Sequence, residues 1–169
     1  VGSRSLVIPR LVLLPPAGTG GSLPGTGVLG RLKTPGEGFT ISPRLRPLHS
    51  GFAVAIGGSD KLVVASDGFG PDGKPTAKLL GLVRDRLDAA MSTPAPRGTK
   101  VALGGWHNPD DDKIEVNVTV VFPKTRQAQA TAFARSNNQL SMARLHEPFE
   151  IIDTGGTGGD RLAAAATTT

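Results

Sequence analysis

Ten residues in the middle of the chain constrain the fold most. From Lys113 to Phe122 the side chains alternate: Ile114, Val116, Val118, Val120 and Phe122 on one side, and Glu115, Asn117 and Thr119 on the other. A period of two is typical of an antiparallel strand with one buried face. Residues 100–106 also predict a strand, and only the acidic turn sequence 108–112 separates the two. The two segments are therefore expected to form a β-hairpin.

Flanking segments predict further strands and two helices. Residues 52–56 and 61–65 are apolar and border a Gly-rich turn, which predicts a second hairpin. A helix is predicted from the capping residue Thr76, with an inner stripe of Leu79, Leu80, Val83, Leu87, Ala90 and Met91. An alanine-rich helix should follow from Thr125 to about Asn138, then strands at 140–145 and 149–152. This order predicts an α+β domain: a small, mostly antiparallel sheet of about five strands, with two helices on one face.

Nearly all of the net charge lies in the first fifty residues. They carry six basic side chains and one acidic side chain, whereas residues 51–169 carry thirteen of each. Residues 1–38 also contain nine Gly and five Pro, a composition typical of linkers. We therefore expect three parts: an extended basic N-terminal arm at 1–48, the α+β domain at 49–154, and a flexible C-terminal tail at 155–169.

Composition limits the class of protein. The 169 residues include six Phe, one Trp, no Tyr and no Cys, so the core must rely on aliphatic side chains and thiolate metal sites are excluded. The apolar run 6–14 is interrupted by Pro9 and Arg10, which is unlike a signal peptide or a membrane span. We expect a soluble protein without a membrane partner, cytoplasmic unless it belongs to a larger particle.

The arm holds most of the residues that we expect to bind partners. Leu11 and Leu13 lie in an apolar stretch that can add as a strap to another protein surface, the alternative being a tail without a role. Four basic residues can attract phosphate or an acidic protein face: Arg31, Lys33, Arg44 and Arg46. In the domain, Trp106 is expected to anchor on the core or on a partner surface.

Candidate catalytic residues are few. Trp106 and His107 end a predicted strand beside Asp110, Asp111 and Asp112, a set that allows acid–base or metal chemistry. The three carboxylates lack the spacing of a calcium loop, and one His is too few for zinc. The same residues are first of all a turn sequence. Asn138 is similarly expected to end its helix in the left-handed conformation. We predict no catalytic, metal or cofactor site.

Several motifs together resemble a group of phage proteins. They are Gly104-Gly105-Trp106-His107-Asn108-Pro109, the 113–118 strand, Ser136-Asn137-Asn138-Gln139 and Thr154-Gly155-Gly156. Residues 100–157 in this respect resemble small uncharacterised proteins of bacteriophages of high-GC Gram-positive bacteria. The resemblance implies a virion-associated protein, but it brings no activity and no catalytic residues.

Three functions follow as hypotheses. The first is a non-enzymatic virion component (minor capsid, decoration or tail accessory protein) that contacts other subunits through its N-terminal arm, as a homo-oligomer or on a lattice. The second is a nucleic-acid-binding accessory protein that uses the basic arm. The third is a small hydrolase or toxin with Trp106, His107 and Asp110–Asp112 at its site.

Overall fold

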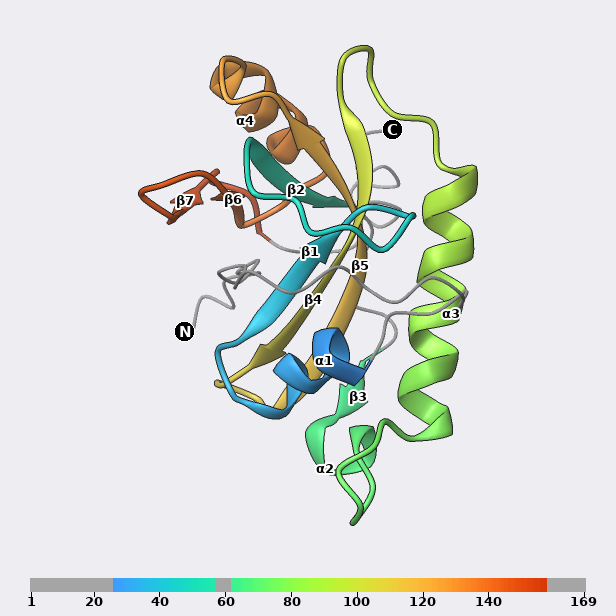
Figure 1. Ribbon diagram of the computed structural model, residues 1–169. Helices are drawn as coiled ribbons and strands as arrows, with labels where there is room; N and C mark the ends of the chain where they lie inside the picture. Colours follow the sequence, from blue (N-terminus) through green and yellow to red (C-terminus); the bar gives the residue numbers. More distant parts are fainter. Residues whose placement is uncertain (1–25, 57–61, 158–169) are drawn as a thin grey trace, which may run out of the picture.

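A single curled antiparallel sheet forms the frame of the domain (Figure 1). The computed structural model describes residues 26–56 and 62–157. The strands are β1 (Gly38–Ile41), β2 (Phe52–Ile56), β3 (Val63–Val64), β4 (Lys100–Asn108), β5 (Lys113–Phe122), β6 (Ser141–Arg144) and β7 (Glu150–Asp153). The helices are α1 (Thr26–Leu29), the 3-10 turn η1 (Gly30–Lys33), α2 (Ala65–Gly68), α3 (Ala77–Ser92) and α4 (Gln127–Ser136). The strand order is β1-β4-β5-β2-β6-β7, with β3 also paired to β5.

The predicted α+β class and antiparallel sheet are confirmed, although the sheet has seven strands rather than about five. The central hairpin also forms as expected, since β4 and β5 pair from Lys100↔Val121 to Asn108↔Lys113. The predicted hairpin between 52–56 and 61–65 is wrong. β2 lies between β5 and β6, whereas β3 pairs with the far end of β5. This arrangement gives β2 a hydrogen-bonding partner on both edges, which a simple hairpin would not.

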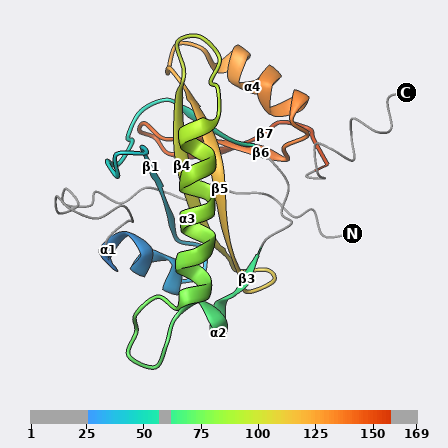
Figure 2. The ribbon, with the colours of Figure 1, turned by 90° about the vertical axis from the view of Figure 1, so that its right-hand side faces the viewer.

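The two long helices pack against the same side of β5 at different points along it: Ile114 and Val116 contact α3, and Val120 and Phe122 contact α4. Figure 2 shows α3 running along β4 and β5, with α4 beside their upper end. Leu79, Val83 and Leu87 of α3 pack in one apolar cluster with β1, β4 and β5. Ala130 and Ala134 of α4 belong to a second cluster with β2, β5 and β6, where their small size lets the helix approach closely. Apolar burial of this kind holds the helices in place, because most of the stability of a helix in a protein comes from the packing of its apolar face.

The predicted start of α3 is confirmed, but its inner stripe needs one correction. The Thr76 hydroxyl accepts a hydrogen bond from the Leu79 amide at 3.4 Å, so Thr76 caps the helix. Leu82 is buried in the cluster, whereas Met91 is 72% exposed at the end of the helix. Met91 was expected on the inner stripe because its spacing fits. It lies in the last turn of α3, past the residues that contact the sheet.

The folded domain begins well before residue 49. Val28, Leu29 and Leu32 belong to the α3 core cluster, and β1 adds Phe39 and Ile41. β1 pairs with β4 along its whole length, from Gly38↔Trp106 to Ile41↔Leu103. The boundary expected at 48/49 is therefore wrong for residues 26–48. A Pro/Gly-rich composition suggested an arm, but five large apolar side chains in this segment are enough to bury it against the sheet.

Candidate functional site

Three loops meet at one end of the sheet. They connect β1 to β2 (residues 42–51), α3 to β4 (residues 93–99) and β5 to α4 (residues 123–126) (Figure 1). Register explains the convergence: Ile41, at the end of β1, pairs with Leu103, and Lys100, at the start of β4, pairs with Val121. Arg126 of the third loop reaches the second and donates from Nη1 to the Arg97 carbonyl at 3.2 Å.

These loops carry basic side chains and no acid. Their five cations and Lys100, the first residue of β4, are here called the basic end: Arg44, Arg46, Arg97, Lys100, Lys124 and Arg126. All six are exposed, and none forms an ion pair with a described residue. Six like charges with low-dielectric protein behind them raise the local concentration of anions. The three loops therefore form a positively charged surface at this end of the sheet.

The neighbouring β6–β7 turn, with its two flanking residues, carries one basic and two acidic side chains. Arg144 forms an ion pair with Glu150 and donates to the Pro148 carbonyl at 2.9 Å. Glu147, in the same turn, also has a partner. Arg144 and Glu150 neutralise one another, so the turn contributes no positive charge and, through Glu147, one negative charge. The positive charge at this end therefore comes from the basic end.

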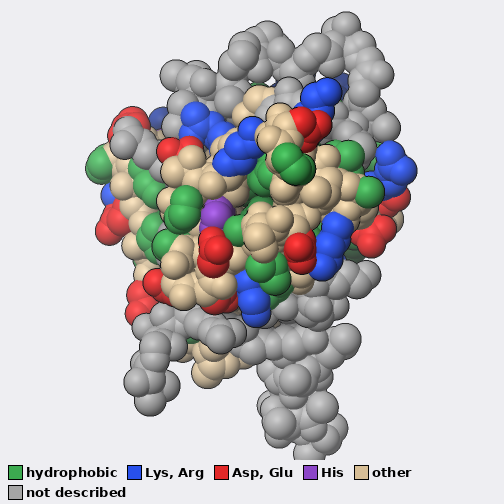
Figure 3. Space-filling model, turned by 90° about the horizontal axis from the view of Figure 1, so that it is seen from below, with side chains coloured by type: hydrophobic (Ala, Val, Ile, Leu, Met, Phe, Trp, Pro, Cys, Tyr) green, Lys and Arg blue, Asp and Glu red, His purple; other side chains and the backbone are tan. Residues whose placement is uncertain are grey.

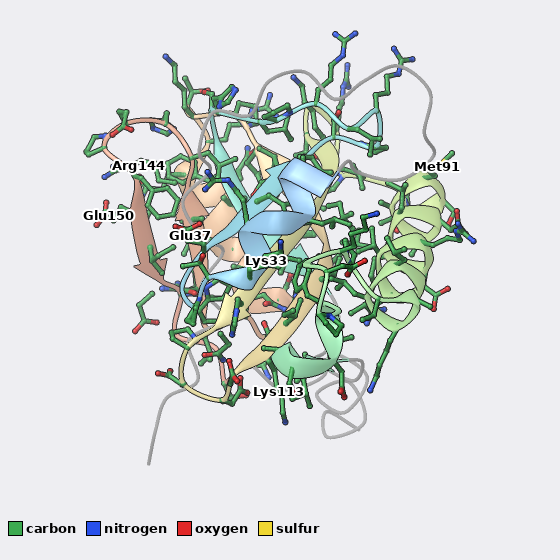
Figure 4. All side chains as sticks on the ribbon, turned by 60° about the horizontal axis from the view of Figure 1, so that its bottom comes forward. Lys33, Glu37, Met91, Lys113, Arg144 and Glu150 are labelled. Atoms are coloured by element: carbon green, nitrogen blue, oxygen red, sulfur yellow. The ribbon has the colours of Figure 1, made fainter. Side chains whose placement is uncertain are left out.

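Two of the predicted basic residues lie elsewhere. Arg31 and Lys33 belong to η1, which precedes β1, whereas Arg44 and Arg46 follow it. Arg31 pairs with Glu37 at 3.5 Å, and the Lys33 ammonium lies 5.3 Å from the centre of the Phe69 ring. Figure 3 shows mixed acidic and basic side chains on the side of the molecule seen from below, and Figure 4 labels Lys33 and Glu37 near one another. The four residues do not form one site.

Sequence reasoning missed Arg97, Lys100, Lys124 and Arg126. The predicted hairpin nevertheless indicates that these four residues lie close together. Residues 93–100 lead into its first strand, and residues 123–126 follow its second strand. In a hairpin, these two positions must lie at the same end. Of the remaining predicted partner-binding residues, only Trp106 is among the described residues, and it does not belong to the basic end. Leu11 and Leu13 are outside the described residues, and Trp106 is only 7% exposed.

His107 and Asp112 form a structural contact. Both His107 ring nitrogens face oxygens: Nδ1 lies 2.8 Å from the Leu32 carbonyl, and Nε2 lies 2.6 Å from the Asp112 carboxylate. His107 is 3% exposed, so this contact ties η1 to the β4–β5 hairpin inside the protein. The carboxylate of Asp111 accepts from the Lys113 amide at 3.2 Å, as expected of a turn. Within residues 26–56 and 62–157, no three His, Asp or Glu side chains form a metal-binding group.

Replacing His107 by Ala is expected to destabilise the domain. The substitution removes the donor to the buried Leu32 carbonyl and leaves a void beneath η1, at a cost of about 2 to 3 kcal/mol of unfolding free energy. Asp112→Asn should cost less, because Asp112 is mostly exposed and the amide still offers an oxygen or an N–H to the ring. Urea unfolding of the two variants measures the difference. Equal stability of His107→Ala and the unchanged protein would contradict the assignment.

The Asn-Gln and Thr-Gly-Gly motifs come together in the fold. Asn138 takes the expected left-handed conformation, with φ 54°. Its side chain accepts from the Thr157 amide at 2.9 Å and donates to the Thr157 hydroxyl at 2.6 Å. The Thr154 hydroxyl and the Gly156 amide both donate to the Gln139 carbonyl. The C-terminal tail was expected to be flexible from residue 155, but these hydrogen bonds fix residues 155–157 to the domain. The two motifs therefore have a structural role.

Comparisons with known proteins found no counterpart: no family model, no curated protein and no solved structure matches the chain. No helix among the described residues has both the length and the apolar character needed to cross a membrane.

Proposed function

We propose that this protein is a non-catalytic accessory protein that binds nucleic acid through the basic end. The observation that carries the proposal is the gathering of six exposed cations, without one acid among them, on three loops and the first residue of β4 at one end of the sheet. Phosphate contacts from Lys and Arg supply most of the affinity of sequence-independent nucleic-acid binding. The predicted use of the N-terminal basic residues is retained for Arg44 and Arg46, but Arg31 and Lys33 are replaced by cations of the other two loops.

The absence of an apolar anchor favours phosphate over an acidic protein. Tight protein–protein interfaces depend on buried aromatic and other large apolar side chains at their centre. The only exposed large apolar side chains among the described residues are Val64 and Met91, and neither lies in the three loops. The basic end offers positive charge without large exposed apolar side chains. Such a surface is suited to the repeating phosphates of nucleic acid, which are bound mainly by charge.

The test is the salt dependence of binding to a labelled DNA duplex. If four to six phosphates are neutralised, the logarithm of the association constant should fall against the logarithm of the salt concentration with a slope of about −4 to −5. Replacing Arg44, Arg46, Lys100 and Lys124 by Gln should reduce that slope by about one for each lost contact. Fluorescence anisotropy between about 50 and 200 mM salt measures both values.

A matched control variant distinguishes binding through the basic end from binding that depends only on the total charge of the protein. Lys33, Lys74, Lys78 and Lys113, away from the basic end, are replaced by Gln to remove the same total charge. The control should lose little affinity, because screening limits exposed charges to a range of about 8 Å at physiological salt. Equal loss in both quadruple variants, or a flat salt dependence of the unchanged protein, would rule out the basic end as the binding surface.

The virion remains the proposed setting, on the strength of the sequence resemblance. Residues 26–48 are part of the domain, so attachment to other subunits through an arm would depend on residues 1–25 alone. Cosedimentation of the full chain with purified phage particles tests this, in comparison with a chain that begins at residue 26. Equal cosedimentation of the two chains would show that residues 1–25 take no part in attachment to the particle.

A further inference from the structure

In the first loop of the basic end, backbone hydrogen bonds close a turn around the two arginines. The Leu45 amide donates to the Ser42 carbonyl, and the Ser42 amide donates to the Arg46 carbonyl, each at 2.8 Å. Leu45 itself is only 9% exposed and belongs to the α3 core cluster. It therefore anchors the turn to the domain, and its exposed neighbours Arg44 and Arg46 extend from a backbone that the fold holds in place.

The other two loops are closed in the same way and contact one another. The Thr99 amide donates to the Pro96 carbonyl at 3.0 Å. The Arg126 amide donates to the Pro123 carbonyl at 2.9 Å. The Arg126 guanidinium lies against Gly98, where a Cβ atom would be 2.6 Å from its Nη1 atom. The cations of the basic end are thus carried on hydrogen-bonded turns that lie beside one another.

The three loops offer no platform on which successive bases can stack. His49 is the only residue in them with an aromatic ring. The phenylalanines at the adjoining strand ends, Phe52 and Phe122, are 2% and 3% exposed, and both belong to the core. Proteins that bind single strands combine positive charge with several exposed aromatic rings, on which the unpaired bases stack. The basic end has the positive charge but not the rings.

We propose that the basic end binds double-stranded nucleic acid in preference to single strands, an inference that rests on the proposed function. A DNA duplex carries about one phosphate charge per 1.7 Å of its axis, and each of its strands about one per 3.4 Å. Each phosphate contact with a duplex therefore releases more counterions than a contact with a single strand. A surface that binds by charge and has no stacking platform gains more affinity from the duplex.

The test compares a short labelled DNA duplex with a single strand that has the same number of phosphates, both bound to the full chain and measured by fluorescence anisotropy. With about five phosphate contacts, the duplex should bind about tenfold more tightly at about 0.1 M salt. Its salt slope should also be steeper, about −0.9 for each contact against about −0.7 for the single strand. The same order of affinities is expected for an RNA duplex and its single strand, because the loops contact phosphate in both.

Two variants show whether the basic end is responsible. With Arg44, Arg46, Lys100 and Lys124 replaced by Gln, the affinities for duplex and single strand should converge. His49→Ala should keep the preference of the unchanged protein, because a single imidazole ring contributes little stacking. A duplex preference that survives in the first variant, or that is lost in the second, would overturn the inference.

Two results with the unchanged protein distinguish the inference from the proposed function. Equal or tighter binding of the single strand would overturn the duplex preference and leave nucleic-acid binding in place. Binding of neither duplex nor single strand at low salt would overturn the proposed function, and the inference with it.

Discussion

A chain that begins at residue 49 is expected not to fold. It lacks β1, the edge strand that pairs with four residues of β4, and it lacks Leu29, Leu32 and Phe39, which are at most 1% exposed in the core. Each of these side chains contributes about 2 to 5 kcal/mol when it is deleted from a core. The three together account for about 6 to 15 kcal/mol, which is as much as the whole unfolding free energy of about 5 to 15 kcal/mol that is usual for a domain.

The single substitution Phe39→Ala isolates this effect without shortening the chain. It should lower the unfolding free energy by about 3 to 5 kcal/mol, because the ring fills the space over Gly105 between β1 and β4. Urea unfolding and the NMR spectrum of the shortened chain are the measurements. A well-dispersed spectrum from a chain beginning at residue 49 would mean that residues 26–48 are an appendage, as their composition suggested.

Replacing Gly51 by Ala is expected to be the most damaging small substitution. Gly51 has φ +105°, a conformation that other residues rarely adopt, and a Cβ atom would lie 2.2 Å from the Phe122 carbonyl oxygen. That oxygen belongs to the end of β5 and cannot move without disturbing the pairing of Phe52 with Phe122. We expect a loss of about 3 kcal/mol or more of unfolding free energy.

Gly81→Ala provides the matched control for that substitution. Gly81 lies exposed in α3, and a Cβ atom there would meet nothing within 4 Å. Alanine should therefore stabilise the helix by about 0.5 to 1 kcal/mol, through its higher helix propensity. Thermal unfolding of both variants gives the comparison. Similar melting temperatures for Gly51→Ala and Gly81→Ala would contradict the close approach of residue 51 to β5.

Local patterns predicted the parts of the fold that local interactions determine. The alternation in residues 113–122 located β5 and its hairpin with β4, and the Thr76 cap located the start of α3. The partner of β2 could not be predicted in this way. Residues 52–56 pair with β5 and β6, some sixty and ninety positions away, and no local pattern specifies such contacts. The apparent turn at residues 57–60 therefore favoured the wrong neighbour.

The candidate site likewise combines residues that the local sequence indicates with an arrangement that only the fold determines. Arg44 and Arg46 were identified as basic residues, but only the pairing of β1 with β4 places them near Lys100. Net charge was counted over two long segments, a basic arm at 1–48 and a neutral remainder. Counting over such long segments concealed the local excess of cations in the loops after α3 and β5. In the fold, charges that are distant along the chain add up because strand ends meet.

The most direct test of the basic end is an NMR titration of the isotope-labelled chain with a short DNA duplex. The amide signals of residues 42–50, 93–100 and 123–126 should shift together, and those of residues 67–78 at the other end should stay in place. Shifts concentrated in residues 67–78, or no shifts at low salt, would contradict binding of nucleic acid through the basic end.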